Sequence, residues 1–480
     1  MSEQILGTGI QLEVEPLRTY DYERAFGAIK ADIEFPSYYI IPQERMGIIK
    51  NQGTVGACVG CVISSLTEVF EKIEAEKDNR NLAEEDVEFS EGWAYGALRE
   101  ATDRYYGMYV SLALEQWRKK GVVPKKYFSF LEEMPDMRDR VDEFPELYEE
   151  AKRYRINSYV SLNYAKKDKR DLAIKEAIYN KNYGLLSVSN KYFHEPHCIM
   201  LIGWNDEADT YIIKNSWGEK WNGDGIAEIP KKEINDAYLI TDEEISLPFV
   251  DVVADDNVWY YGDVKNVYLS NLMNGVSETE FAPLEDVTRA EFSTLLGRLV
   301  NLSNERLENI VKILKIKHNR ANNYYNPSDY LIQKKQTDEM SFKDVLEDAW
   351  YYNDVKIAYE YGLINGKSAE IFDPEANITR AEIATLIVRI CDLFIEKLNY
   401  ILKKSNKKTI KKSNEEIYFT DVTEKDWFYS AVKGVYNLGI MQGKNEDCFD
   451  PNVFTTRAET AAIINRLSKY FDSMNFNAVN

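Results

Sequence analysis

Residues 52–58 read Gln-Gly-Thr-Val-Gly-Ala-Cys, and apolar residues at helical spacing follow them. That spacing predicts an amphipathic helix that has Cys58 on its first turn. The apolar residues at helical spacing are Val59, Val62, Ile63, Leu66, Val69, Phe70 and Ile73. A helix N-terminus favours negative charge on the sulfur of Cys58. Gly53 and Gly56 let the preceding backbone turn tightly, and Gln52 carries an amide donor. The segment therefore holds two requirements for attack on a carbonyl, a thiolate and a donor for the oxyanion.

Two other interpretations of this segment stay open at this point. A single cysteine before a helix is commonly just a small buried residue. Cys58 and Cys61 also form a C-x-x-C at a helix start, a pattern found in thiol oxidoreductases.

A thiolate nucleophile needs an imidazole and a group that orients it. Of the three histidines, His197 opens an apolar run to Trp204 that predicts a buried strand. A second strand over 211–214 ends in Asn215-Ser216-Trp217-Gly218, so pairing of the two strands would place His197 near Asn215. His194 is interpreted as a solvated loop residue and His318 as part of a lysine-rich stretch.

The order Gln52, Cys58, His197, Asn215 and its separations resemble those of papain-like cysteine peptidases. The resemblance implies an α+β fold in which Cys58 is the nucleophile and His197 the general base and acid. It also implies that Asn215 orients the imidazole, that Gln52 and the Cys58 backbone N–H bind the oxyanion, and that Trp217 shields the Asn215–His197 hydrogen bond.

Four positions depart from the family pattern. Val55 stands where the family has a disulfide-forming cysteine, and Val59 where it has a tryptophan. Asn222 and Ile226 replace a later glycine and aromatic residue. These departures affect the expected substrate preference rather than the nucleophile.

Gly107 and Trp217 are further candidates for substrate binding. The resemblance implies that a glycine in this region offers backbone hydrogen bonds to an extended peptide. An ordinary turn glycine is an equally good interpretation.

Composition indicates a large protein of about three domains. The 480 residues are 44% hydrophobic and carry a net charge of −21, which argues against nucleic-acid binding. The lysine-rich stretch 403–412 is interpreted as a solvated linker, and five scattered cysteines predict no disulfide framework. The sequence contains no run of about 18 apolar residues, the length that would predict a membrane span. No metal or cofactor is expected.

The second half contains an internal repeat of Phe-x-Asp-Val, a tryptophan, a glycine and Thr-Arg-Ala-Glu. Trp259, Trp350 and Trp427 each precede their Thr-Arg-Ala-Glu by 29 residues and their glycine by 16. Two constant registers predict three copies of a helix-loop-helix unit that bury their apolar faces against one another. The threonine and glutamate of each motif predict a capping box.

This template resembles the S-layer homology domain, over residues 249–300, 341–394 and 418–472. The resemblance implies a pseudo-threefold helical bundle with grooves for an anionic, often pyruvylated, secondary cell wall polymer. The implied groove residues are Arg289, Arg380, Arg457, Trp259, Trp350, Trp427, Lys367 and Lys444. Guanidinium groups suit carboxylates geometrically. Equally open are tryptophans that belong to the core and arginines that pair with carboxylates of the chain itself.

Repeat one differs most from the template. Asn271 stands where the other repeats have glycine, Val276 where they have lysine, and Ala282 where they have aspartate. These differences predict a weak or inactive groove in repeat one and competent grooves in repeats two and three.

The predicted layout is a papain-like peptidase domain over 1–248 followed by the three repeats, with a helical and loop connector over 301–340 and a lysine-rich connector over 395–417. The predicted function is hydrolysis of protein or peptide substrates by an enzyme tethered to a bacterial cell surface. Two alternatives are a wall-binding structural protein with an inactive peptidase fold and a thiol oxidoreductase. Residues 1–5 lack signal-peptide features, so the export route stays open.

Overall fold

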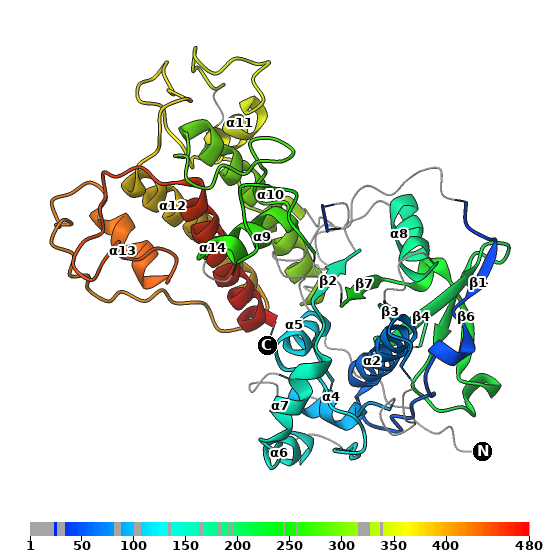
Figure 1. The fold of residues 1–480 in the computed structure, drawn as a ribbon. Coiled ribbons are helices and arrows are strands. Elements are labelled where there is room, and N and C mark those ends of the chain that lie inside the picture. The colour runs from blue at the N-terminus through cyan, green and yellow to red at the C-terminus, as the bar shows by residue number, and fades with distance from the viewer. Residues whose placement is uncertain are drawn as a thin grey trace. The chain divides into compact units, whose positions relative to one another are not determined.

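A computed structural model describes residues 24–25, 34–80, 88–99, 107–132, 136–162, 167–179, 184–189, 192–193, 195–242, 245–255, 258–314, 327–336 and 339–479. Within these residues the chain divides into two units, with a boundary between Ser246 and Leu247. The first unit mixes helices and strands, whereas the elements of the second are helical (Figure 1).

The helix predicted around Cys58 is α2 (Cys58–Lys77) of the first unit, and Cys58 lies on its first turn as predicted. The remaining helices are α4 (Glu91–Ala97), α5 (Val110–Lys120), α6 (Asp136–Asp142), α7 (Leu147–Ala151) and α8 (Lys167–Tyr179). Short 3-10 turns are η1 (Gln43–Arg45), η2 (Lys152–Tyr154), η3 (Trp221–Gly223) and η4 (Lys231–Glu233). The strands are β1 (Tyr38–Ile40), β2 (Ser158–Ser161), β3 (Gly184–Ser189), β4 (His197–Asn205), β5 (Thr210–Lys214), β6 (Ile226–Pro230) and β7 (Asp236–Thr241).

The strands form one antiparallel sheet in the order β2-β7-β3-β4-β5-β6, and β1 also pairs with β4. The predicted pairing of β4 with β5 is confirmed, with Met200 opposite Lys214. Because β4 begins at His197 and β5 ends one residue before Asn215, the antiparallel register brings these two residues to the same end of the sheet.

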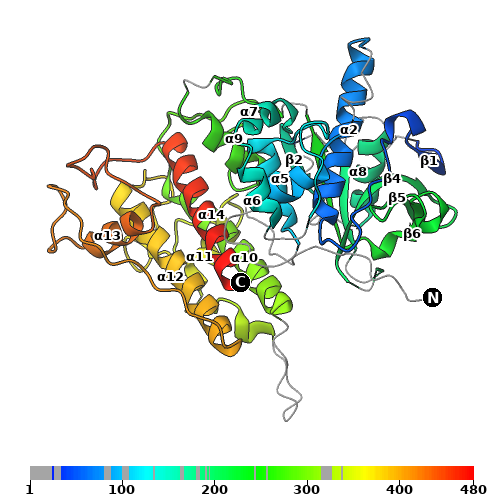
Figure 2. The same ribbon diagram turned by 90° about the horizontal axis from the view of Figure 1, so that it is seen from below.

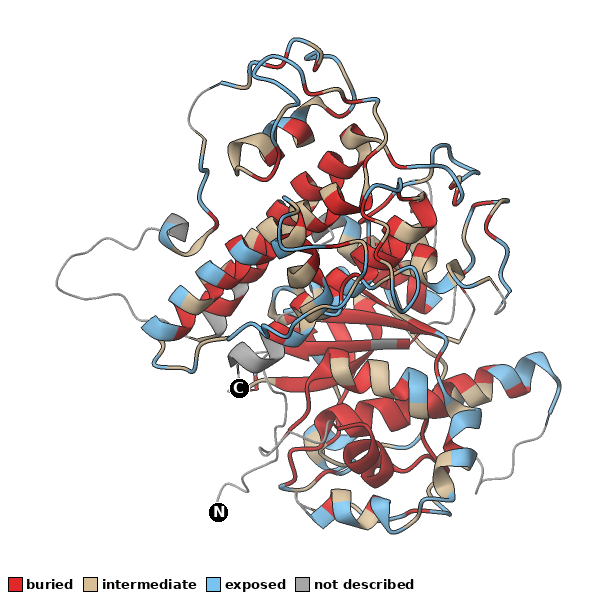
Figure 3. Cartoon of the chain, turned by 90° about the vertical axis from the view of Figure 1, so that its left-hand side faces the viewer, coloured by how far each residue is buried: buried red, intermediate tan, exposed pale blue. Residues whose placement is uncertain are grey.

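Helix α2 packs on β3 and β4 and buries most of its length (Figures 1 and 3). Alternate residues of β4, Cys198, Met200 and Ile202, belong to the same apolar core as Leu66 and Phe70 of α2. This alternation is the period of two expected of a strand with a distinct face toward each layer. Helix α8 contacts the same two strands.

The second unit contains three helix pairs, so the predicted helix-loop-helix repeat is confirmed. The pairs are α9 (Tyr261–Leu269) with α10 (Arg289–Ile313), α11 (Tyr352–Glu360) with α12 (Arg380–Lys404), and α13 (Tyr429–Asn437) with α14 (Arg457–Val479). A 3-10 turn, η5 (Pro327–Tyr330), precedes the second pair. The long helices α10, α12 and α14 lie side by side (Figures 1 and 2).

The three repeats are joined in a closed cycle. The backbone N–H at the start of each long helix donates to the loop of another repeat: Arg289 to Ala376 (2.9 Å), Arg380 to Val453 (3.0 Å) and Arg457 to Glu285 (2.8 Å). The predicted capping boxes are also confirmed, because backbone N–H groups and side chains bond reciprocally in Thr288–Glu291, Thr379–Glu382 and Thr456–Glu459.

The close approach of β1 to β4 at Gly203 generates a stability prediction. A Cβ added to Gly203 would lie 2.1 Å from the carbonyl oxygen of Tyr39, a backbone atom that cannot rotate away. We expect Gly203→Ala to lower the free energy of unfolding of the first unit by about 1–3 kcal/mol. Scanning calorimetry of the full chain measures this.

Gly262→Ala is the matched control, because Gly262 lies in α9 with nothing within 4 Å of the added Cβ. Alanine is the better helix former, so this variant is expected to be unchanged or slightly more stable. An unfolding transition unaltered by Gly203→Ala would contradict the packing argument.

Candidate active site

Cys58 is the first residue of α2 and is fully buried. The turn before it is closed by a hydrogen bond from Val55 N to Gln52 O (3.1 Å), and Gly53 adopts a positive φ of 58° in this turn. The thiol therefore lies where the helix dipole favours a thiolate. Cys58 lies close enough to Cys198, the residue that follows His197, for its charge to contribute to the raised pKa of the Cys198 thiol.

The imidazole of His197 is bound to the side chain of Asn215, with Nε2 and Oδ1 2.7 Å apart. The backbone N–H of Ser216 also donates to Oδ1 (2.8 Å), which identifies that atom as the amide oxygen. Nε2 of His197 must then donate, so the lone pair of the neutral ring is on Nδ1. Nδ1 is buried and has no hydrogen-bond partner among the described residues.

The amide of Gln52 is fixed in the same way. Its Nε2 donates to Val55 O (2.8 Å), and its Oε1 accepts from the hydroxyl of Ser216. The backbone N–H of Gln52 donates to Ser216 O (2.9 Å). Ser216 thus connects the Asn215 segment with the Gln52 turn through two hydrogen bonds, a role that the sequence did not indicate.

Aromatic rings enclose His197. The ring of Trp217 lies 4.7 Å from the imidazole at an interplanar angle of 32°, and the ring of Phe193 meets the imidazole edge-on at 4.9 Å. Trp221 packs on both Trp217 and Phe193. Burial lowers the pKa of His197 to about 4, against the opposing effect of the hydrogen bond to Asn215. The ring is therefore neutral at pH 7.

A buried ammonium group lies beneath the Gln52 turn. Lys50 Nζ contacts Glu68 Oε1 of α2 (2.5 Å) and the backbone oxygen of Phe89 (2.9 Å), with Glu91 of α4 at 3.5 Å. Burial opposes the charge on Lys50, but the two carboxylates outweigh it and raise the pKa of Lys50. The Gln52 turn and α2 are thereby tied together.

Lys214, which precedes Asn215, is also buried. Its Nζ donates to Met46 O (2.6 Å), and burial lowers the pKa of Lys214 to about 8, partly offset by Glu68. The strand that leads to Asn215 is thus held against the segment that leads to Gln52.

The other cysteines near Cys58 are poor thiolates. Cys61 and Cys198 are buried, and burial raises the pKa of each thiol well above its usual range. No disulfide joins the described cysteines.

Gly107 is buried, has a φ of 100° and lies in the bend before α5. Residues 101–106 beside it fall outside the described residues. So do His194, interpreted above as a solvated loop residue, and His318, interpreted as part of a lysine-rich stretch.

The repeat residues line three grooves, and every groove is built from all three repeats. Groove A contains Arg289 of repeat one, Gly366 of repeat two and Trp427 of repeat three. Groove B contains Arg457, Gly275 and Trp350, and groove C contains Arg380, Gly443 and Trp259. Their volumes are about 250, 420 and 200 Å³ respectively. The expectation of one groove per repeat is therefore wrong, since each groove is a composite.

The tryptophans do not belong to the core. Trp259, Trp350 and Trp427 are 61%, 67% and 68% exposed at the rims of their grooves. The lysines instead form ion pairs, Lys367 with Asp373 in groove A and Lys444 with Glu459 of groove C.

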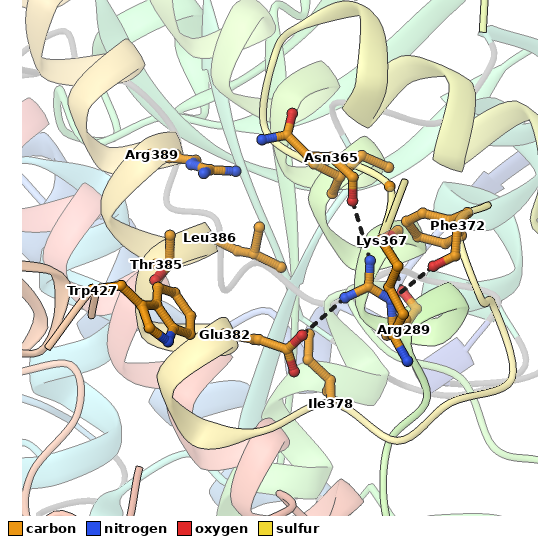
Figure 4. Close-up of a pocket in the computed structure, with 13 residues that line it drawn as sticks. Arg289, Asn365, Lys367, Phe372, Ile378, Glu382, Thr385, Leu386, Arg389 and Trp427 are labelled. Carbon is orange, nitrogen blue, oxygen red and sulfur yellow. Dashed lines mark hydrogen bonds and ion pairs between the residues drawn. The ribbon is translucent and has the colours of Figure 1, made fainter. Parts of the chain in front are cut away.

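The arginines of the Thr-Arg-Ala-Glu motifs bond the chain itself, and two of them, Arg289 and Arg457, pair with its carboxylates, as the alternative above expects. In groove A, Arg289 donates to Phe372 O (3.0 Å), Glu382 Oε1 (3.0 Å) and Asn365 O (3.1 Å), as Figure 4 shows. Arg457 repeats all three contacts in groove B, with Phe281 O, Glu291 Oε1 and Asn274 O. Arg380 contacts Phe449 O and Gln442 O in groove C.

A second arginine lines each groove and was missed from the sequence. Arg298, Arg389 and Arg466 each follow the arginine of the Thr-Arg-Ala-Glu motif by nine residues. That constant register was visible in the sequence but belongs to no motif.

Within the described part of the chain, no cluster of three or more His, Cys, Asp or Glu side chains could hold a metal ion. Among the helices described here, none has the length and apolar character required to span a bilayer.

Comparisons with known proteins agree with this arrangement. The model of the papain family cysteine protease matches residues 42–246, and that of the S-layer homology domain matches 248–293, 341–384 and 418–461. An endoglucanase of Bacillus sp. (strain KSM-635) is 26% identical over 46% of this chain and 19% of its own length. The surface-layer 125 kDa protein of Lysinibacillus sphaericus is 25% identical over 44% and 14%.

Among solved structures, xylellain, a cysteine protease from Xylella fastidiosa, is 17% identical and covers 51% of this chain and 99% of its own, with a TM-score of 0.40. The chain spans less than a fifth of the length of the first curated relatives that it matches. The α+β unit thus belongs to the papain family of cysteine proteases, and the helical region after it consists of three S-layer homology domains.

Proposed function

We propose that this chain is a cysteine peptidase that cleaves peptide bonds with Cys58, His197, Asn215 and Gln52. The observation that carries the proposal is the hydrogen bond from His197 Nε2 to Asn215 Oδ1, whose direction the Ser216 backbone fixes. It leaves Nδ1 as the basic atom of a buried, neutral imidazole, which is the state that a general base requires.

In the first step, His197 Nδ1 removes the thiol proton and Cys58 Sγ forms a bond to the peptide carbonyl carbon. The resulting imidazolium then gives its proton to the leaving amine as the C–N bond breaks, and an acyl-enzyme remains. Water then loses a proton to His197 as its oxygen bonds to the acyl carbon. The C–S bond breaks, the imidazolium returns its proton to Cys58 Sγ, and the carboxylic acid product leaves and ionises in solvent.

The oxyanion in both steps would be stabilised by Gln52 Nε2 and the backbone N–H of Cys58. One of the two N–H bonds on Gln52 Nε2 is directed at Val55 O, and this contact together with the one from Ser216 orients the amide. Donors that are already oriented stabilise developing charge without reorganisation. Gly107 remains a weak candidate for binding the extended substrate.

The three S-layer homology domains support attachment of the enzyme to a bacterial cell surface. The candidate ligand is an anionic secondary cell wall polymer, often pyruvylated, bound in grooves A, B and C. The surface-layer relative supports this location. Attachment would raise the concentration of the peptidase near substrates of the envelope.

Loss of activity in Cys58→Ala is the first test. The variant is expected to lose at least about a thousandfold in the rate of casein hydrolysis and all labelling by an epoxysuccinyl peptide, because no other described thiol has the same helix-start position. Cys61→Ser is the matched control and should retain both, since its thiol is buried with a raised pKa.

Hydrolysis that persists in Cys58→Ala would contradict the peptidase assignment. An unlabelled wild-type protein would favour an inactive peptidase fold. Activity that depends equally on Cys58 and Cys61 in a disulfide-exchange assay would favour the thiol oxidoreductase.

The role of Trp217 predicts a pKa change at His197. Burial is the main reason that the pKa of His197 lies at about 4, and the Trp217 ring covers the imidazole. In a Cys58→Ala background, we expect Trp217→Ala to admit water to the imidazolium and raise this pKa toward the ordinary value of 6.5. NMR titration of the imidazole Cε1–H resonance of His197 measures this pKa. The chain has three histidines, so this resonance has to be distinguished from only two others.

Trp221→Ala serves as the control, because its ring packs on Trp217 and not directly on His197. A smaller rise is expected there. If Trp217→Ala leaves the His197 titration unchanged, the aromatic ring does not set the pKa.

Wall attachment predicts that the tryptophans at the groove rims carry binding. The triple variant Trp259→Ala/Trp350→Ala/Trp427→Ala should pellet less with purified cell-wall sacculi than the wild type, with an unchanged melting temperature because all three rings are exposed. Sacculi stripped of secondary polymer by hydrofluoric acid should pellet neither protein. Equal pelleting of both proteins on intact sacculi would exclude the tryptophans.

A further inference from the structure

The arginine of each Thr-Arg-Ala-Glu motif uses its hydrogen-bond donors on other residues of the chain rather than presenting them to a ligand in the groove. Arg289 uses all three of its nitrogen atoms on Phe372 O, Glu382 and Asn365 O, and its guanidinium also lies 4.9 Å from the ring of Phe372. Arg380 and Arg457 stack in the same way on Phe449 and Phe281. A ligand that withdrew such an arginine would break the joint between two repeats.

The second arginine is placed differently. Arg389 lies on the same face of α12 as Glu382 and Thr385, which precede it by seven and four residues, and lines groove A. Among the described residues it makes one hydrogen bond, from Nη1 to Leu363 O at 2.7 Å. In Figure 4 its guanidinium lies apart from the ion pair of Arg289 with Glu382.

The same stripe recurs in the other two grooves. Arg298 follows Glu291 and Thr294 on α10 and donates to Leu272 O (3.1 Å). Arg466 follows Glu459 on α14 and approaches Ile440 O at 3.5 Å. Each of these arginines thus uses one nitrogen on a backbone carbonyl, and its fork keeps further N–H donors.

Burial bears on arginines of both sets. It lowers the pKa of Arg389, whose guanidinium is therefore partly desolvated. Arg298 is also desolvated but faces Asp354 of repeat two. By contrast, the pKa of Arg457 reflects burial opposed by Glu291 and two further acidic groups.

We propose that Arg298, Arg389 and Arg466 bind the carboxylate of an anionic sugar ligand, whereas Arg289, Arg380 and Arg457 hold the repeats together. This inference rests on the proposed wall binding and identifies the residues that bind the negatively charged carboxylate of the ligand. A guanidinium fork accepts a carboxylate through two parallel hydrogen bonds. Trp427 lines the same groove as Arg389, so its exposed ring can cover the apolar face of a sugar whose carboxylate contacts the arginine.

The experiment compares two probes on the full chain by titration calorimetry. One is a pyruvylated methyl hexoside, and the other is the methyl ester of its pyruvate group, which has the same shape without the charge. The triple variant Arg298→Gln/Arg389→Gln/Arg466→Gln should bind the carboxylate probe about tenfold or more weakly than the wild type and the ester equally well. Arg389→Gln alone should reduce the number of sites that prefer the carboxylate.

The matched control removes the same charge outside the grooves, as Lys403→Gln/Lys404→Gln/Lys411→Gln. It should keep the wild-type preference for the carboxylate, which separates a local fork from general attraction. Arg298→Lys/Arg389→Lys/Arg466→Lys keeps the charge without the fork and should retain part of the preference. If the triple glutamine variant has a lowered melting temperature, the triple lysine variant is used in its place to test whether these arginines bind the carboxylate.

Two outcomes overturn the inference in distinguishable ways. A wild-type chain that binds neither probe removes the proposed wall binding and this inference with it. A wild-type chain that prefers the carboxylate, together with glutamine and lysine variants that prefer it equally, leaves wall binding intact and excludes the second arginines.

Discussion

The arrangement of the candidate active site depends on one buried ammonium group, that of Lys50. Isolated charges are expensive to bury, and breaking a buried ion pair by removing one partner typically costs about 3–5 kcal/mol. Lys50 meets this constraint by contacting Glu68 on α2 and the Phe89 carbonyl, with Glu91 nearby. Because Gln52 lies two residues after Lys50 and α2 begins with Cys58, the charge fixes the donor segment relative to the nucleophile helix.

In the helical region, partly buried guanidinium groups are likewise compensated by contacts with other segments of the chain. Arg289, Arg380 and Arg457 each enter the loop of another repeat and bond its carbonyl oxygens, and two of them also pair with a glutamate there. Contacts of one kind that run from each repeat to the next must either close or continue indefinitely. Here they close after three, since the arginine of the third repeat binds the loop of the first.

Local pattern was enough to predict much of this. Apolar spacing predicted a helix with Cys58 on its first turn and the pairing of β4 with β5. Constant motif registers predicted the helix-loop-helix units and capping boxes of the repeats. Each of these features depends on residues close in the chain. The composite grooves were not predictable, since Arg289 and Trp427 are distant in sequence and meet only after the cycle closes. The link through Ser216 and the aromatic contact of Phe193 with His197 likewise join segments that no motif relates.

The same cyclic geometry changes the meaning of the substitutions in repeat one. Val276 replaces a lysine, which suggested a groove deficient in positive charge, but Lys367 in groove A is paired with Asp373. Repeat one has also lost that aspartate, since Ala282 stands in its place. An ion pair has thus been exchanged for two apolar side chains without a change in net charge. Groove B, with a volume of about 420 Å³ against 250 Å³ in groove A, is therefore lined by the apolar Val276 where groove A is lined by the paired Lys367.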